Sequence, residues 1–139
     1  MHLEHVNLTV KNIENTLSFY QAAFPHWTIR GEGKHVWYGK PRRWLHFGDN
    51  NQYLAFCSDG EGEPRDLTGY QVGLAHFAFV VTNLTAMQKR LLNAGFTHAK
   101  DGAKDPHRSN IYYIDPNGFE VEFVEYHSDL PEQRNAYVA

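Results

Sequence analysis

The chain has 139 residues, of which 42% are hydrophobic and 21% are charged, so its composition fits one globular domain and excludes wholesale disorder. Lys and Arg total 13 against 16 Asp and Glu, and this net charge of −3 argues against a global field that would hold nucleic acid. Cys57 is the only cysteine, which excludes an intrachain disulfide framework and a multi-cysteine zinc site. With no apolar run of about 20 residues and no signal-peptide pattern, we expect a cytoplasmic protein that binds no membrane.

The sequence contains an internal repeat. Residues 10–13 (Val-Lys-Asn-Ile) resemble residues 81–84 (Val-Thr-Asn-Leu), and each segment lies between an alternating strand pattern and a helical pattern. The strand positions then correspond as well: Val6, Leu8 and Val10 with Phe77, Phe79 and Val81. His5 and His76 coincide on the opposite strand face, although other residues set the register.

The rest of each half predicts a helix followed by strands. Apolar side chains recur at steps of three or four residues in 13–24 and in 84–94, as in helices that pack on a sheet. We expect Pro25 to end the first helix and Gly95 to cap the second. Pairs of strands joined by turn-rich connections are predicted at 43–47 and 52–56, and again at 110–114 and 119–124.

These elements predict a single α+β domain over 1–139, built from two copies of a strand–helix–strands module that share one sheet. Module one covers 1–57 and module two 74–126, with a glycine-rich linker at 58–73 between them. A polar tail follows at 127–139. Its composition leaves two alternatives open, a disordered end or a cover for a cleft or a partner.

His5, His76 and Glu122 are the candidate metal ligands. If the helices cover one face of the sheet, the other face forms a cleft, and strand alternation places all three side chains on that open face. Two imidazoles and one carboxylate suit a borderline divalent metal with coordination positions left for substrate. A single strand histidine or glutamate is more often only a half-buried or solvated residue. The combination of all three favours a metal site.

These patterns resemble the vicinal oxygen chelate superfamily, which includes glyoxalase I, bleomycin-resistance proteins, extradiol dioxygenases and fosfomycin-resistance thiol transferases. The matching segments are 5–10 (His-Val-Asn-Leu-Thr-Val), 17–20 (Leu-Ser-Phe-Tyr), 76–81 (His-Phe-Ala-Phe-Val-Val) and 115–123 (Asp-Pro-Asn-Gly-Phe-Glu-Val-Glu-Phe). The resemblance extends over residues 1–126. It implies two βαβββ modules forming a U-shaped mixed sheet with helices on the outer face. It also implies a divalent metal that chelates vicinal oxygens of a small-molecule substrate, and a homodimer.

The resemblance implies four ligand positions, one on the first and one on the last strand of each module. His5, His76 and Glu122 occupy three of them, whereas Ala55 stands at the fourth, where glyoxalase I usually has an acidic ligand. This weakens the resemblance to glyoxalase I, and we expect a three-ligand site for one divalent ion (Fe, Mn, Ni or Zn). The alternative is an enzyme remnant that lost its activity together with the fourth ligand.

A set of two His and one Glu resembles two branches of the superfamily. Extradiol dioxygenases hold Fe(II) in this way, and residues 111–122 fit their pattern, although His107 lies closer to Ile111 than their spacing allows. Fosfomycin-type thiol transferases use the same ligands, but Asn7 stands where they usually have Thr. Lyase or isomerase chemistry is equally compatible with the ligands. A metal-free drug-binding protein of the bleomycin-resistance type is the alternative outside enzymes.

Three further residues are candidate catalytic groups. Counting back from the first hairpin turn places His46 beside Tyr53 on the open face, as an acid/base or a substrate contact, although a solvated strand histidine is more common. In the second hairpin the same counting pairs Tyr113 with Glu120, whereas a slip of one residue presents Tyr112 instead. The dioxygenase-like pattern favours Tyr112.

A run of basic residues alternates with Trp and Tyr before the middle of the chain: Lys34, Lys40, Arg42 and Arg43. Such a run can hold an anionic or aromatic substrate. More often it is a solvated strand edge that discourages pairing with another chain.

Overall fold

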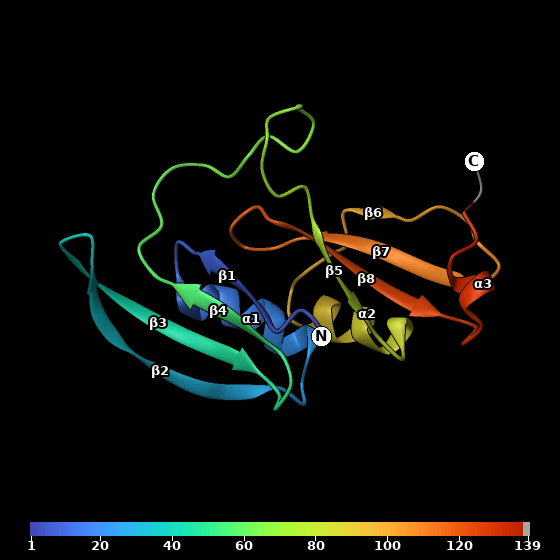
Figure 1. Ribbon diagram of the computed structural model, residues 1–139, viewed down its shortest axis with the longest axis horizontal. Helices are drawn as coiled ribbons and strands as arrows, with labels where there is room; N and C mark the ends of the chain where they lie inside the picture. The colour runs from blue at the N-terminus through green and yellow to red at the C-terminus, as the bar shows by residue number, and fades with distance from the viewer. Residues whose placement is uncertain (138–139) are drawn as a thin grey trace. The chain divides into compact units, whose positions relative to one another are not determined.

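The computed structural model describes residues 1–137, which form two compact units, one of residues 1–63 and one that begins at residue 64. The boundary falls inside the predicted glycine-rich linker. Each unit contains a strand, a helix and three further strands in that order (Figure 1). The prediction of an α+β protein with two βαβββ modules is therefore confirmed.

The first unit has one helix and four strands. Its elements are β1 (His5–Thr9), α1 (Ile13–Ala23), β2 (Thr28–Trp37), β3 (Lys40–Gly48) and β4 (Tyr53–Cys57). The strand order in the sheet is β1-β4-β3-β2, with β1 parallel to β4 and the other neighbours antiparallel. The buried side of α1 packs on the sheet, where Tyr20 stacks on Phe56 with ring centres 5.7 Å apart.

The second unit repeats this plan with a shorter edge strand. Its elements are β5 (Phe77–Val80), α2 (Leu84–Asn93), β6 (Lys100–Asp101), β7 (Arg108–Ile114), β8 (Glu120–Tyr126) and α3 (Pro131–Arg134). The strand order is β5-β8-β7-β6, so each unit has its own four-stranded mixed sheet. No helix in residues 1–137 is long and apolar enough to cross a membrane.

The repeated asparagine of the internal repeat begins both long helices. The Asn12 side chain accepts a hydrogen bond from the Asn15 backbone N–H at 2.8 Å, and Asn83 does the same for Ala86 at 3.0 Å. These N-caps satisfy backbone donors that have no partner inside the helix. The predicted cap at Gly95 is also confirmed, since Gly95 follows the end of α2 with φ +93°. The repeat is thus a helix-start signal in each module.

The second hairpin corrects one predicted pairing. The sequence count paired Tyr113 with Glu120, but β7 and β8 pair Ile114 with Glu120, which is one residue further along. The cause is the turn, in which the Asp115 backbone N–H donates to the Phe119 carbonyl at 2.9 Å and leaves three residues in the loop. Gly118 completes this turn with φ +92°, a conformation that side chains with a Cβ adopt only at a cost.

In the first hairpin, the observed strand pairing is shifted by two residues from the pairing predicted by counting back from the turn. The structure pairs Phe47 with Leu54 and Gly48 with Tyr53, where counting paired Phe47 with Gln52. A shift of two residues leaves every side chain on its predicted face, because side chains alternate with a period of two. His46 therefore stays on the open face of the first sheet.

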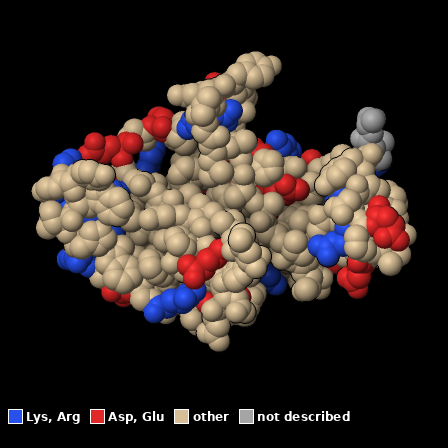
Figure 2. All heavy atoms as spheres, in the orientation of Figure 1, with Lys and Arg blue, Asp and Glu red and all other residues tan. Residues whose placement is uncertain are grey.

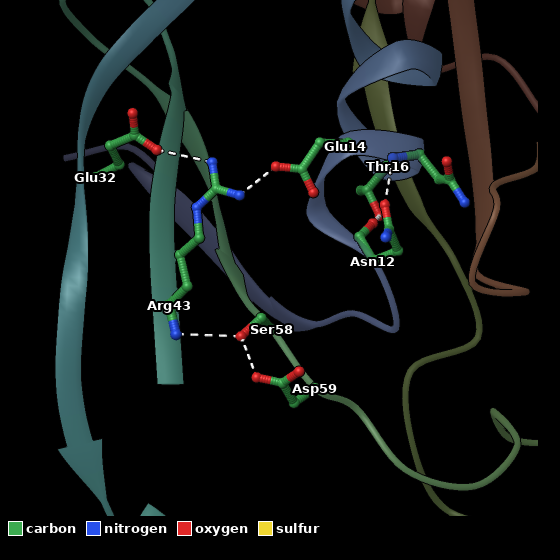
Figure 3. A network of polar contacts seen from close by, with 8 residues as sticks. Asn12, Glu14, Thr16, Glu32, Arg43, Ser58 and Asp59 are labelled. Atoms are coloured by element: carbon green, nitrogen blue, oxygen red, sulfur yellow. Dashed lines mark hydrogen bonds and ion pairs between the residues drawn. The ribbon is translucent and has the colours of Figure 1, made fainter. Parts of the chain in front are cut away.

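The basic run does not form one substrate-holding patch. The Arg43 guanidinium contacts Glu14 of α1 and, at 2.8 Å, Glu32 of β2, and the Arg43 backbone N–H donates to Ser58 (Figure 3). Arg42 lies on the opposite strand face. The face shown in Figure 2 has Lys and Arg side chains dispersed among Asp and Glu side chains rather than in one basic area. Arg43 instead links β3 to α1 and to β2.

The described part of the tail is held against the second sheet. Arg108 of β7 donates hydrogen bonds to the backbone carbonyls of Arg134 at 3.1 Å and of Ala136 at 3.3 Å. The same guanidinium lies 3.3 Å from a carboxylate oxygen of Asp105. These contacts argue against a disordered end for residues 127–137, while residues 138–139 of the predicted tail lie outside the described part.

Candidate functional site

The second unit brings His76 and Glu122 together. His76 immediately precedes β5, and the next residue but one, Ala78, pairs with Glu122 on β8. Nε2 of His76 lies 3.1 Å from Oε2 of Glu122. The neighbours of Glu122 along β8, Val121 and Phe123, are fully buried on the helix side, so Glu122 faces the open side with 16% of its side chain exposed.

Tyr112 lies beside this pair. It is the cross-strand partner of Glu122, and its ring meets the His76 ring edge-on with centres 5.5 Å apart. Lys100 of β6 places its ammonium 4.7 Å from the centre of the Tyr112 ring. Burial, and then the negative charge of Glu122, raise the pKa of Tyr112 above its ordinary value. The phenol is therefore protonated at neutral pH and can donate a hydrogen bond.

Tyr113 lies on the other face of the same strand. It pairs with Val121, is only 2% exposed, and its ring meets that of Phe123 with centres 5.8 Å apart. Burial raises its pKa. Of the two tyrosines left open by the sequence, Tyr112 is thus the one on the face that carries Glu122.

His5 occupies the corresponding place in the first unit. Its Nδ1 lies 2.9 Å from a carboxylate oxygen of Glu4, and its ring stacks on Tyr53 with centres 4.6 Å apart. The hydrogen bond with His5 is the main cause that lowers the pKa of Glu4. With Nδ1 engaged by Glu4, the His5 ring presents Nε2 to any further partner.

His46 continues the stack begun by His5. Its ring lies 4.6 Å from the Tyr53 ring and 4.9 Å from the Trp44 ring, centre to centre. Arg30 places its guanidinium 4.4 Å from the centre of the Tyr53 ring. Burial, followed by the positive charges of His5 and Arg30, lowers the pKa of His46. A neutral His46 at pH 7 can accept a proton.

Several residues at these places were missed by the sequence analysis. Glu4, Lys100 and Asn110 each contact a predicted site residue, and Arg30 contacts Tyr53, whose ring stacks on the predicted His46. Glu4 is the immediate neighbour of His5, and a carboxylate beside a candidate ligand histidine is a signal that the sequence did offer. The other three contacts depend on strand register, which alternation alone does not fix.

The donor set suits a divalent ion, although its three members belong to two units. Among residues 1–137, no group of three or more His, Cys, Asp or Glu side chains is arranged to hold a metal ion. His76 and Glu122 of the second unit form a pair, whereas His5 belongs to the first unit. Ala55, the residue at the fourth position, is 4% exposed and carries no donor atom.

Comparisons with known proteins give one family. The family model for the Glyoxalase/Bleomycin resistance protein/Dioxygenase superfamily matches residues 2–123. A search of curated proteins gives no match.

Similar solved structures share the fold at low sequence identity. A glyoxylase/bleomycin resistance protein/dioxygenase domain from Frankia sp. EAN1pec is 18% identical, with 98% of each chain covered and a TM-score of 0.73. A glyoxalase family protein from Enterococcus faecalis is 20% identical over 89% of this chain and 97% of that one, with a TM-score of 0.71. The fosfomycin resistance protein FosX from Listeria monocytogenes, in complex with Mn(II) and sulfate, is 18% identical over 97% and 98%, with a TM-score of 0.68. With the family model matching most of its length, the chain belongs to the Glyoxalase/Bleomycin resistance protein/Dioxygenase superfamily.

Proposed function

We propose that the protein is a divalent-metal-dependent enzyme that acts on a small oxygen-rich molecule, with His5, His76 and Glu122 as the metal ligands. The observation that carries the proposal is the 3.1 Å separation of His76 Nε2 and Glu122 Oε2. Bonds from nitrogen or oxygen to Zn²⁺ are about 2.0–2.2 Å long, so two adjacent donors of one ion lie about 3 Å apart. The pair is already spaced as two such donors.

The environment of His5 supports its role as the third ligand. A histidine that binds metal almost always uses its other ring nitrogen to donate to a carboxylate or a carbonyl. Glu4 accepts in this way from His5 Nδ1 at 2.9 Å and leaves Nε2 for the metal. Because Ala55 supplies no donor, coordination positions remain for water and substrate.

The groups around the ligands would complete the chemistry. A divalent ion at this place supplies Lewis acidity toward neighbouring substrate oxygens and, in the case of Fe(II), reactivity toward O2. Tyr112, with its raised pKa, donates a hydrogen bond to a substrate oxygen. His46, with its lowered pKa, accepts a proton from substrate. This division of roles suits an extradiol-type dioxygenase and equally a lyase or isomerase.

A second candidate function is metal-free binding of a planar drug, as in bleomycin resistance. The stack of Trp44, His46, Tyr53 and His5 favours it, because Trp44, His46 and Tyr53 are half-buried and a flat ligand can extend such a row of rings. A thiol transferase of the fosfomycin type is a further alternative. The Mn(II) bound to FosX makes manganese one of the first metals to test.

Metal analysis tests the proposal. Protein purified without a tag or chelator is analysed for its elements, alone and as H5A, H76A and E122Q. We expect about one equivalent of Fe, Mn, Ni or Zn in the wild type and loss of metal in each variant. H127A is the matched control, since His127 contacts Ser109 and none of the proposed ligands.

The outcome also selects the next assay. Iron directs substrate tests to catechols with O2, whereas Mn, Ni or Zn directs them to lyase, isomerase and transferase substrates. Absence of metal after reconstitution contradicts the proposal and favours the planar-ligand alternative. A cytoplasmic homodimer is part of the proposal, and the molar mass in solution tests the dimer.

A further inference from the structure

The two carboxylate oxygens of Glu122 have different partners. Oε2 lies 3.1 Å from His76 Nε2, whereas Oε1 accepts a hydrogen bond from the Asn110 side-chain amide, Nδ2, at 2.8 Å. Asn110 lies on β7 two residues before Tyr112, the cross-strand partner of Glu122, and so shares its open face. The oxygen that is not beside His76 is thus held by a neutral donor.

Because Gly102 has no Cβ, the side-chain amide of Asn110 has the space to lie against it. The Gly102 backbone N–H donates to the Asn110 carbonyl at 2.8 Å, which places the two residues side by side at the edge of the sheet. A Cβ built on Gly102 would lie 1.8 Å from Oδ1 and 2.4 Å from Nδ2 of Asn110. Real side chains do not tolerate such distances, so any residue with a Cβ at this position would displace the amide.

The same amide also reaches Tyr112. Nδ2 of Asn110 lies 3.4 Å from the Tyr112 hydroxyl oxygen, a weak contact beside the 2.8 Å bond to Glu122. An amide nitrogen carries two hydrogens, so it can serve both acceptors at once. Asn110 therefore links the proposed metal ligand to the proposed hydrogen-bond donor.

We propose that Asn110 is a positioning residue for Glu122, with Gly102 supplying the space that fixes the Asn110 amide. By holding Oε1, Asn110 restricts the Glu122 side chain before metal arrives and leaves Oε2 for the ion. The inference rests on the proposed function, since it assumes that Glu122 is a ligand. It adds two residues that the ligand set does not contain.

Metal titration of the chelator-treated protein tests this role. Zn(II) and Mn(II) are each titrated by calorimetry into wild type, N110A, N110D and G102A, with thermal unfolding measured on the same samples. Removal of a partner of a metal ligand typically weakens metal binding about 10- to 100-fold, which is our expectation for N110A. N110D keeps the shape of the side chain but replaces the donating amide by a carboxylate, which cannot donate to Glu122 Oε1, so metal binding is expected to weaken as well.

The glycine gives an independent check that does not alter Asn110 itself. G102A is expected to weaken metal binding as N110A does, and the double variant is expected to be no weaker than N110A alone, because both changes remove one interaction. S109A is the matched control, since Ser109 is the neighbour of Asn110 on β7 and contacts His127 instead. It is expected to leave the dissociation constant unchanged.

Each result decides the inference. If the metal dissociation constants of N110A and N110D lie within about threefold of the wild-type value, the positioning role of Asn110 is overturned and the proposed ligands remain. A wild type that binds neither ion overturns the proposed function and the inference together. If N110A lowers the unfolding temperature, its loss of metal binding can come from loss of the fold, and the metal affinities of N110D and G102A are then compared with wild type. Unchanged affinity in both variants means that Asn110 has only a structural role.

Discussion

Tyr112 lies directly opposite Glu122 on the paired strands β7 and β8, so the phenol and the carboxylate occupy the same open face. This relationship is set by the three-residue turn that follows β7, since a turn one residue longer or shorter would bring Tyr113 to that face instead. The turn therefore decides which tyrosine stands beside the candidate metal ligands.

Replacement of Tyr112 by Phe is expected to slow the reaction while leaving metal binding unchanged. The change removes only the hydroxyl, which is a donor for substrate and not a proposed ligand, and loss of such a group typically costs about 100-fold or more in rate. Y113F is the matched control, because Tyr113 is 2% exposed on the buried face. Rate and metal content of the two variants check this, and an equal loss of rate in both would contradict the role of Tyr112.

The pH profile gives a second test of Tyr112. Its pKa is raised, so the phenol stays protonated across the neutral range and loses its proton only above its ordinary value of about 10. Activity that depends on this donor is therefore expected to persist through neutral pH and to fall only in strongly alkaline solution. A fall in activity at mildly alkaline pH that Y112F abolishes would count against this assignment.

Alternation of side chains was enough to predict the open face of Glu122. This residue lies on β8 between the fully buried Val121 and Phe123, because burial on one side of a strand fixes a period of two, whereas His5 begins β1 and His76 immediately precedes β5. The contacts of Glu4 and Asn110 were not predictable in this way. The contact of Glu4 with His5 depends on the side-chain rotamers. The contact of Asn110 with Glu122 joins diagonal neighbours on two strands, and these neighbours change with every shift in register.

The length of the turn between β7 and β8 could not be predicted by counting residues in the sequence. Residues 115–118 have the composition of a turn, but the number of residues in the loop follows from the Asp115-to-Phe119 hydrogen bond and from the left-handed Gly118. Composition therefore predicts where the hairpin turns, and not which residues face one another.

Gly118→Ala is expected to destabilise the protein more than Gly95→Ala. Both glycines have nearly the same positive φ, +92° and +93°, so the conformational cost of about 1–2 kcal/mol is common to the two variants. Only at position 118 would the new Cβ meet another group, at 2.5 Å from Cγ of Pro64, whereas nothing lies within 4 Å at position 95. The added crowding is expected to cost about 1 kcal/mol more. Urea unfolding measures both values, and equal losses would contradict the predicted close contact.

The ion pair between Glu14 and Arg43 is expected to make stability depend on pH in acid. The hydrogen bond from Arg43 lowers the pKa of Glu14 below its usual value of 4.5, so its stabilising effect is complete above that value and is lost as pH falls through the lower, folded-state pKa. E14Q should therefore be less stable than wild type at pH 7, by no more than about 1 kcal/mol because the pair is exposed, and this difference should shrink between pH 7 and pH 3.

Denaturant unfolding of wild type and E14Q at both pH values checks this. E63Q is the control, because Glu63 pairs with Lys11 at 3.3 Å with 85% of its side chain exposed, and such pairs contribute little. A stability difference between wild type and E14Q that grows toward low pH would show the opposite sign from the one expected.

His46 is expected to set the acid side of the activity profile. Burial, and then the positive charges of His5 and Arg30, lower its pKa below the ordinary 6.5, so the imidazole is neutral at pH 7 and becomes charged only in more acidic solution. If His46 accepts a proton from substrate, the rate falls as pH drops through this lowered pKa, and H46Q removes most of the rate at pH 7. R30Q is the informative companion: removing its positive charge raises the pKa of His46 and shifts the acid limb to higher pH. An acid limb that does not move in R30Q would mean that another group controls it.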